Sequence, residues 1–226
     1  MNRRDFVRGL ILAPLAAPTL AAAAGGRTVK LAAAFPYLDV YLATPPAKRS
    51  RFYAVYVAMQ GTRPAPDFRA TIVESGGRGT PLVLERDGRV ASLPSLAQLR
   101  SDAVLQTDAA QADDIKLALE IRPNVPVSTE VDPGALAEAL AQVNAVIANS
   151  AGVLKLVVPK LNTVYFPGAG AGKVVFADGH ATPLPITQNR YLPGAPYFDT
   201  SQSKGAHSVV LAKQPSRLLL GGHPRT

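Results

Sequence analysis

The glycine-rich run Pro167-Gly168-Ala169-Gly170-Ala171-Gly172-Lys173 is the first segment whose residues could do chemistry. A phosphate-binding loop needs glycine, four residues and then Gly-Lys-Ser/Thr, so that its amides and lysine surround the phosphates. Here Pro167 stands in place of the first glycine, and Val174 stands in place of the hydroxyl residue that binds magnesium. A strand is expected after this run, whereas a phosphate loop opens a helix. We therefore interpret the run as a flexible turn.

The three histidines of the sequence are His180, His207 and His223. None of them stands at the i, i+4 spacing with which helical histidines bind zinc. His180 follows Asp178-Gly179 in an expected turn and His223 lies in the tail, so both are expected on the surface. His207 begins an expected strand behind a long loop, and it is kept as a binding candidate.

Nucleophile and acid–base patterns are missing from the sequence. No Gly-x-Ser-x-Gly pentapeptide occurs, and the nearest approach, residues 74–77, is typical of a loop between strands. Asp113 and Asp114 are adjacent, and neighbouring residues on a strand point to opposite faces, so this pair cannot share one site. The sequence holds no cysteine, which excludes thiolate metal sites and a cysteine nucleophile. No catalytic residue, metal or cofactor is therefore predicted.

The segment from Gln188 to Asp199 is the remaining candidate, because it combines three aromatic residues, one arginine and rigid prolines. Such mixtures are found at recognition surfaces. If this segment binds a ligand, we expect Arg190 and Tyr191 to contact it, with Tyr197 in support and His207 nearby. The alternative is a surface loop that packs against its own domain.

Alternating apolar residues predict that these candidates are positioned mainly by β-strands. Asp87-Gly88 and Asp178-Gly179 each separate apolar runs, which indicates hairpins, and a third hairpin is expected around Gln214-Pro215. We predict about ten strands and the α+β class, with mainly antiparallel sheet. A proline- and glycine-rich loop is expected at 187–205.

One long helix is predicted near residues 133–150. Asp132 can cap it and Pro133 suits the first helical position. Leu136, Leu140 and Val143 recur at helical spacing, so one face of the helix is expected to pack against the sheet.

The first two dozen residues have the three parts of a secretory signal. Residues 2–8, Asn-Arg-Arg-Asp-Phe-Val-Arg, are positively charged, and an uncharged stretch follows that ends at Ala22 and Ala24 in a cleavage pattern. Arg3-Arg4 followed by Phe6 resembles the twin-arginine family of signals position for position, apart from Asn2, where that family usually has serine or threonine.

This resemblance implies that the twin-arginine translocase exports the chain already folded to the periplasm. The expected organisation is a signal over 1–24, cleaved at Ala23 or Ala24, and a single β-rich mature domain over 25–226. A general secretory signal or a membrane anchor is the alternative. The apolar stretch is shorter than the roughly 20 residues of a spanning helix and contains Pro14 and Pro18, so no stable transmembrane segment is expected after cleavage.

Composition and charge limit the classes of partner. Hydrophobic residues make up 47% of the 226 residues and charged residues 18%, which indicates a globular chain. The net charge is +8, and without Arg3, Arg4, Arg8 and Asp5 it becomes +6, from 21 basic and 15 acidic residues. This excess favours an anionic envelope component, with ordinary solubility charge as the alternative. No stretch interleaves arginines with aromatic residues, so no nucleic acid is expected.

The order of an opening Tyr-Leu-x-x-Tyr, several strands, a leucine-rich helix, Ala151-Gly152 and Val158-Pro159 resembles a family of exported proteobacterial proteins of unknown function. This resemblance covers most of 36–186 and implies one continuous domain without a known activity. The expected function is a non-catalytic periplasmic binding or envelope-associated protein. The alternative is a periplasmic hydrolase whose site assembles from distant residues, which a histidine such as His207 beside a carboxylate and a serine would favour.

Overall fold

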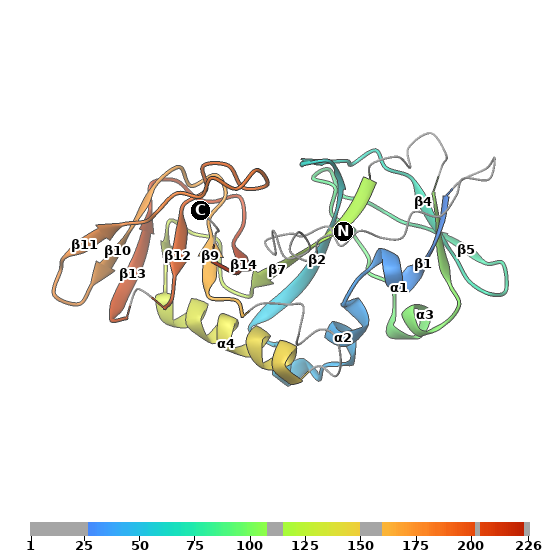
Figure 1. The fold of residues 1–226 in the computed structure, drawn as a ribbon, viewed down its shortest axis with the longest axis horizontal. Coiled ribbons are helices and arrows are strands. Elements are labelled where there is room, and N and C mark those ends of the chain that lie inside the picture. Colours follow the sequence, from blue (N-terminus) through green and yellow to red (C-terminus); the bar gives the residue numbers. More distant parts are fainter. Residues whose placement is uncertain (1–26, 108–114, 150–159, 202–203, 224–226) are drawn as a thin grey trace, which may run out of the picture. The chain divides into compact units, whose positions relative to one another are not determined.

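The computed structural model describes residues 27–107, 115–149, 160–201 and 204–223. These residues form fourteen strands and four α-helices, and every strand pairing between them is antiparallel (Figure 1). The predicted α+β class with mainly antiparallel sheet is confirmed. More strands form than the ten or so expected, because several have only two or three residues, too few to show an alternating pattern. The signal region 1–24 and the strand expected at 154–158 lie outside the described residues.

The described chain is organised as two compact units. The amino-terminal unit contains residues 27–45 and 54–120, and the carboxy-terminal unit contains residues 46–53 and 121–223. One boundary between the units falls between residues 45 and 46, and the other two fall inside β2 (Phe52–Gln60) and β7 (Ile115–Pro123). These two strands share a sheet with β3 (Arg63–Pro64) in the order β3-β2-β7. The single mature domain over 25–226 stays a prediction.

The amino-terminal unit contains a four-stranded sheet and three short helices. The sheet has the order β1-β6-β4-β5, with bounds Arg27–Lys30, Val104–Thr107, Ala70–Val73 and Gly79–Pro81. The helices are α1 (Leu31–Ala34), α2 (Leu38–Ala43) and α3 (Leu96–Arg100). A core of buried apolar side chains holds these elements together, and it includes Leu31, Phe35, Leu38, Tyr56, Ile72, Leu99 and Leu105.

The carboxy-terminal unit contains two sheets, a long helix and a 3-10 helix, η2 (Pro46–Arg49). The first sheet has the order β11-β10-β13-β8, with bounds Ala181–Pro183, Gly172–Phe176, Ala206–Leu211 and Glu130–Val131. The second has the order β12-β9-β14, with bounds Tyr197–Asp199, Thr163–Tyr165 and Leu219–Gly221.

The hairpin expected around Gln214-Pro215 does not form, so that prediction was wrong. β13 pairs with β10 and β8, while β14 pairs with β9 in the other sheet. The backbone N–H of Ser216 donates to the carbonyl of Pro167, 2.8 Å away, and this contact directs the turn between the strands toward the glycine-rich run. The two flanking runs are both apolar because each is buried in its own sheet. The hairpin turn expected at Asp178-Gly179 does connect β10 with β11.

The predicted helix is α4 (Pro133–Asn149), and it runs beneath the strands of its unit in the view of Figure 1. Its buried residues are Pro133, Leu136, Ala139, Leu140 and Val143, the helical spacing on which the prediction rested. An Asp132 carboxylate oxygen accepts a hydrogen bond from the backbone N–H of Gly134 at 2.8 Å and so caps the helix start. Asn144 makes two hydrogen bonds with the backbone of Leu161, at 2.7 and 2.8 Å, and thereby ties α4 to the segment before β9.

Within the described residues, no helix combines the length and the apolar content that a bilayer crossing requires.

Candidate functional site

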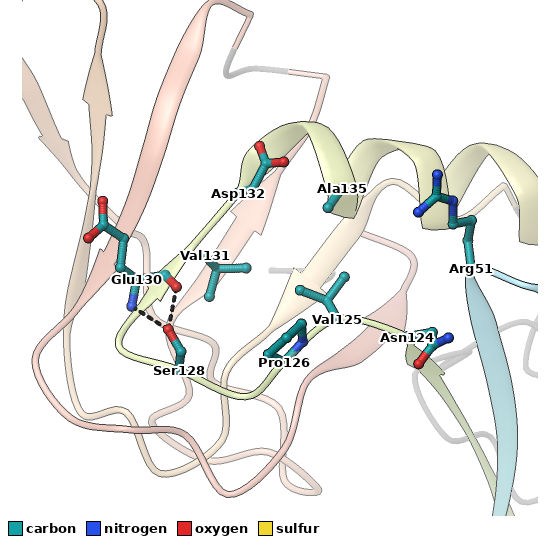
Figure 2. Close-up of a pocket in the computed structure, with 9 residues that line it drawn as sticks. All are labelled: Arg51, Asn124, Val125, Pro126, Ser128, Glu130, Val131, Asp132 and Ala135. Atoms are coloured by element: carbon teal, nitrogen blue, oxygen red, sulfur yellow. Dashed lines mark hydrogen bonds between the residues drawn. The ribbon is translucent and has the colours of Figure 1, made fainter.

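The carboxy-terminal unit holds a cavity of about 320 Å³ beside the start of α4 (Figure 2). Its walls come from Arg51 at the start of the unit, from the chain between β7 and β8, from β8 itself and from the first turn of α4. The lining residues are Arg51, Asn124, Val125, Pro126, Ser128, Glu130, Val131, Asp132 and Ala135.

Hydrogen bonds between distant segments fix the wall that contains Arg51. The backbone N–H of Asn124 donates to the carbonyl of Arg51 at 2.8 Å, and the Asn124 side chain donates to the carbonyl of Ser50 at 3.1 Å. On the other side, the backbone N–H of Arg51 donates to Oε1 of Gln142 on α4 at 2.7 Å. These contacts join the residues that follow η2, the residue that follows β7, and α4 around the cavity.

Apolar side chains occupy the middle of the lining, as Figure 2 shows for Val125, Pro126 and Val131. Arg51 and Asn124 lie at one end, and Ser128 and Glu130 lie at the other. The charged groups already have partners: the Arg51 guanidinium lies 3.0 Å from a Glu138 carboxylate oxygen, and a Glu130 carboxylate oxygen accepts from Ser208 at 2.8 Å. The nine lining residues include no histidine and no cysteine.

The predicted binding residues do not line this cavity. Arg190 and Tyr191 contact each other: the guanidinium donates to the Tyr191 hydroxyl at 2.8 Å and lies 4.8 Å from the centre of its ring. Tyr197 belongs to β12, so part of the segment expected as a loop is a strand. His207 is exposed on β13, and among the described residues no hydrogen bond or ion pair involves it.

A second group of polar side chains forms on the sheet β12-β9-β14. Asp199 of β12 and Gly221 of β14 both stand opposite Thr163 of the central strand, β9. Directly opposed residues of antiparallel strands lie on the same face of a sheet. His223 follows Gly221 by two residues, which brings its imidazole to the side of the sheet where Asp199 lies.

Asp199 is the centre of this group, with only 4% of its side chain exposed. One carboxylate oxygen lies 2.8 Å from Nδ1 of His223. The other accepts from the backbone N–H and the hydroxyl of Ser201, at 2.8 and 2.6 Å. The Asn162 amide lies 3.4 and 3.5 Å from the two oxygens. These donors surround both oxygens, so the hydrogen-bonding capacity of the buried carboxylate is satisfied.

Aromatic rings pack beside this Asp199–His223 pair. Tyr197 and His223 meet edge to face with ring centres 6.0 Å apart, and the Tyr165 ring lies 5.8 Å from that of Tyr197. The Tyr165 hydroxyl donates to the carbonyl of Gly222 at 2.6 Å, which fixes the chain just before His223. Burial raises the pKa of Tyr165 and of Tyr197, and the charge of Asp199 raises both further.

His223 was expected as a surface residue of the tail. Its imidazole is indeed 46% exposed, but it contacts a buried carboxylate that lies 24 positions earlier. Sequence reasoning missed this pair because its two members meet only through the strand order of the sheet. The strand that carries Asp199 has only three residues, too few to show an alternating pattern in the sequence.

Three or more His, Cys, Asp or Glu side chains placed to hold a metal ion are not found in the described part of the chain. No protein-family model, curated protein or solved structure matches this chain.

Proposed function

We propose that this chain is an exported periplasmic binding protein that holds a small ligand in the cavity beside α4. The observation that carries this proposal is the cavity itself, a preformed space of about 320 Å³ with apolar residues in its middle and polar residues at its ends. Ligand pockets in proteins are mostly apolar concave sites of about 300–1,000 Å³ with a few polar groups that fix orientation. The expected ligand is a small molecule with an apolar body and hydrogen-bonding ends.

The charges of the lining favour a ligand without strong net charge. The Arg51 guanidinium pairs with Glu138, and the Glu130 and Asp132 carboxyl groups point away from the middle of the lining in Figure 2. A ligand in the middle of the cavity would therefore meet apolar surface from Val125 and Val131. Binding rather than chemistry is the role that this lining supports.

Location and further partners complete the proposal. The match of Arg3, Arg4 and Phe6 to the twin-arginine pattern supports export through the twin-arginine translocase and cleavage after the alanines that end the signal. The net charge of +6 expected for the mature chain supports attraction to an anionic component of the envelope.

A cavity-filling substitution tests the binding site. Ala135 lines the cavity, and a tryptophan there would occupy the space, whereas Ala137 is an exposed residue on the same helix. The protein is isolated from the periplasm and examined by native mass spectrometry. We expect a retained small molecule on the wild-type and Ala137→Trp proteins, and its loss from Ala135→Trp. A wild-type protein without bound molecule, or equal retention by both variants, would refute the cavity as the site.

A further inference from the structure

We propose that His223, oriented by Asp199, is a general base that activates water for the hydrolysis of a neutral acyl ester. This site is separate from the cavity, and it adds a catalytic activity to the binding function proposed above. It rests on the geometry of two side chains and on a contrast with a second aspartate–histidine pair in the same unit.

The hydrogen bond to Asp199 decides which imidazole nitrogen can take a proton. In the proposed site the Asp199 carboxylate accepts from the Nδ1–H of His223, the nitrogen that lies 2.8 Å from its oxygen. Nε2 of the neutral ring then carries the lone pair. The His223 side chain is 46% exposed, so its ring contacts solvent, while the buried Asp199 carboxylate fixes its orientation. An imidazole held in this way by a carboxylate is the arrangement that general bases use.

The position of Ser201 indicates that water, rather than this serine, is the nucleophile. Its hydroxyl donates to the Asp199 oxygen at 2.6 Å and does not lie on the imidazole. In a serine hydrolase the serine hydroxyl would form a hydrogen bond with the histidine nitrogen that faces away from the aspartate. Ser201 therefore positions the carboxylate, and Asp199 in turn positions His223.

The character of the surrounding groups indicates the substrate class. The groups that contact Asp199 and His223 among the described residues are the amide of Asn162, the hydroxyl of Ser201 and the tyrosine ring of Tyr197, with Tyr165 next to it. These are neutral groups around one negative charge. A phosphate ester would need a cation to offset its own charge, so an uncharged carbonyl compound fits better.

In the proposed hydrolysis, His223 acts first as a base and then as an acid. Nε2 of His223 removes a proton from water while the water oxygen bonds to the ester carbonyl carbon. The tetrahedral intermediate collapses with cleavage of the bond to the alcohol oxygen, and the imidazolium returns its proton to that oxygen. The products are a carboxylic acid and an alcohol, and His223 is again neutral.

His180 and Asp178 provide an internal comparison. Nδ1 of His180 lies 2.5 Å from an Asp178 carboxylate oxygen, but 69% of the Asp178 side chain is exposed. The His180 ring stacks on Phe176 with ring centres 4.1 Å apart. Solvent weakens an exposed pair of this kind, so its imidazole is held less firmly than that of His223. The same two residue types thus occur in the chain with a buried and an exposed carboxylate.

Nitrogen-15 NMR of the mature protein tests the geometry, since only three imidazoles need to be assigned. We expect the neutral His223 ring to carry its proton on Nδ1, and Asp199→Asn to reduce that preference. A neutral His223 ring with its proton on Nε2 would overturn the proposal. This readout does not depend on activity, and it does not depend on the cavity beside α4.

Hydrolysis of p-nitrophenyl acetate tests the chemistry. Free imidazole also reacts with this ester, so three matched variants are compared: His223→Gln, His180→Gln and His207→Gln. We expect His223→Gln to lower the rate constant by about 100-fold, the usual contribution of a general base, and the other two to leave it near the wild-type value. Asp199→Asn should lower the rate constant by about tenfold or more, because an amide at this position no longer favours the tautomer of His223 that carries its proton on Nδ1. Equal rates for all three histidine variants, with unchanged circular dichroism, would overturn the proposal.

Discussion

Nδ1 of His223 lies 2.8 Å from a carboxylate oxygen of Asp199, although the two residues are 24 positions apart in the chain. They meet because β12 and β14 pair with opposite edges of β9, which places Asp199 and Gly221 on either side of Thr163. The carboxylate is buried and the imidazole is half exposed. This relationship connects the architecture of the smaller sheet to the site proposed above for proton transfer.

Removing the Asp199 carboxylate should destabilise the fold. Asp199→Ala removes a buried carboxylate that accepts from Ser201 and Asn162, and hydrogen bonds to charged groups contribute about 1.5–3 kcal/mol. We expect a loss of about 2–3 kcal/mol in the free energy of unfolding, measured by urea denaturation. Asp178→Ala is the matched control, and because its carboxylate is 69% exposed, it should change that free energy far less than Asp199→Ala does. Similar losses for both variants would contradict the structure.

A methyl group at Gly172 should also destabilise the carboxy-terminal unit. A Cβ there would lie 2.7 Å from Cδ1 of Leu184, 2.9 Å from Cδ2 of Leu211 and 3.1 Å from the carbonyl oxygen of Val210. Gly172→Ala should therefore lower the free energy of unfolding by about 1–3 kcal/mol, the usual cost of overpacking. Gly76 has open space around its Cβ position, so Gly76→Ala should be close to neutral in the same denaturation experiment.

The start of α3 depends on a capping box. The Ser95 hydroxyl accepts from the backbone N–H of Gln98 at 3.2 Å, and the Gln98 side chain accepts from the backbone N–H of Ser95 at 3.0 Å. Ser95→Ala should cost about 1 kcal/mol of stability by thermal or urea unfolding. Ser95→Asp keeps an acceptor at that position and should recover most of the loss, and an unrecovered loss would argue against the cap.

Two tyrosines should resist alkaline ionisation until the protein unfolds. Burial raises the pKa of Tyr56 and of Tyr165 far above the ordinary value, with smaller contributions from Asp39 and Tyr37 at Tyr56 and from Tyr197 and Asp199 at Tyr165. A pKa raised on folding contributes stability below the unfolded value near 10, and that stability is lost as pH rises further.

Absorbance at 295 nm measures this ionisation, and the chain holds seven tyrosines and no tryptophan. We expect two of the seven to titrate only together with the loss of circular dichroism. Smooth ionisation of all seven in the folded protein would show that Tyr56 and Tyr165 are not buried.

The export proposal is tested by changing both arginines of the signal to lysine. Arg3→Lys with Arg4→Lys preserves the charge but removes the pair that the twin-arginine pattern requires. We expect unprocessed precursor in the cytoplasm, detected by fractionation and immunoblotting. Periplasmic delivery at the wild-type level would contradict the twin-arginine assignment.

Local patterns in the sequence predicted the regular elements well. The capping Asp132 and the spacing of Leu136, Leu140 and Val143 predicted α4, and alternation predicted β2 and β7. These features are encoded within ten to twenty neighbouring residues, because helix and strand periodicities bring one face of an element to the core. Strands of two or three residues, such as β8, were missed because no period fits inside them.

The candidate sites were decided by tertiary structure. The sequence by itself determined the α+β class, the long helix, the absence of cysteine chemistry and the pattern of the signal. The cavity depends on Asn124 and Gln142 reaching Arg51 from different parts of the chain. The Asp199–His223 pair depends on which strand pairs with which edge of β9. Strand partners are chosen by burial and hydrogen bonding summed over the whole unit, so neither site could be derived from neighbouring residues alone.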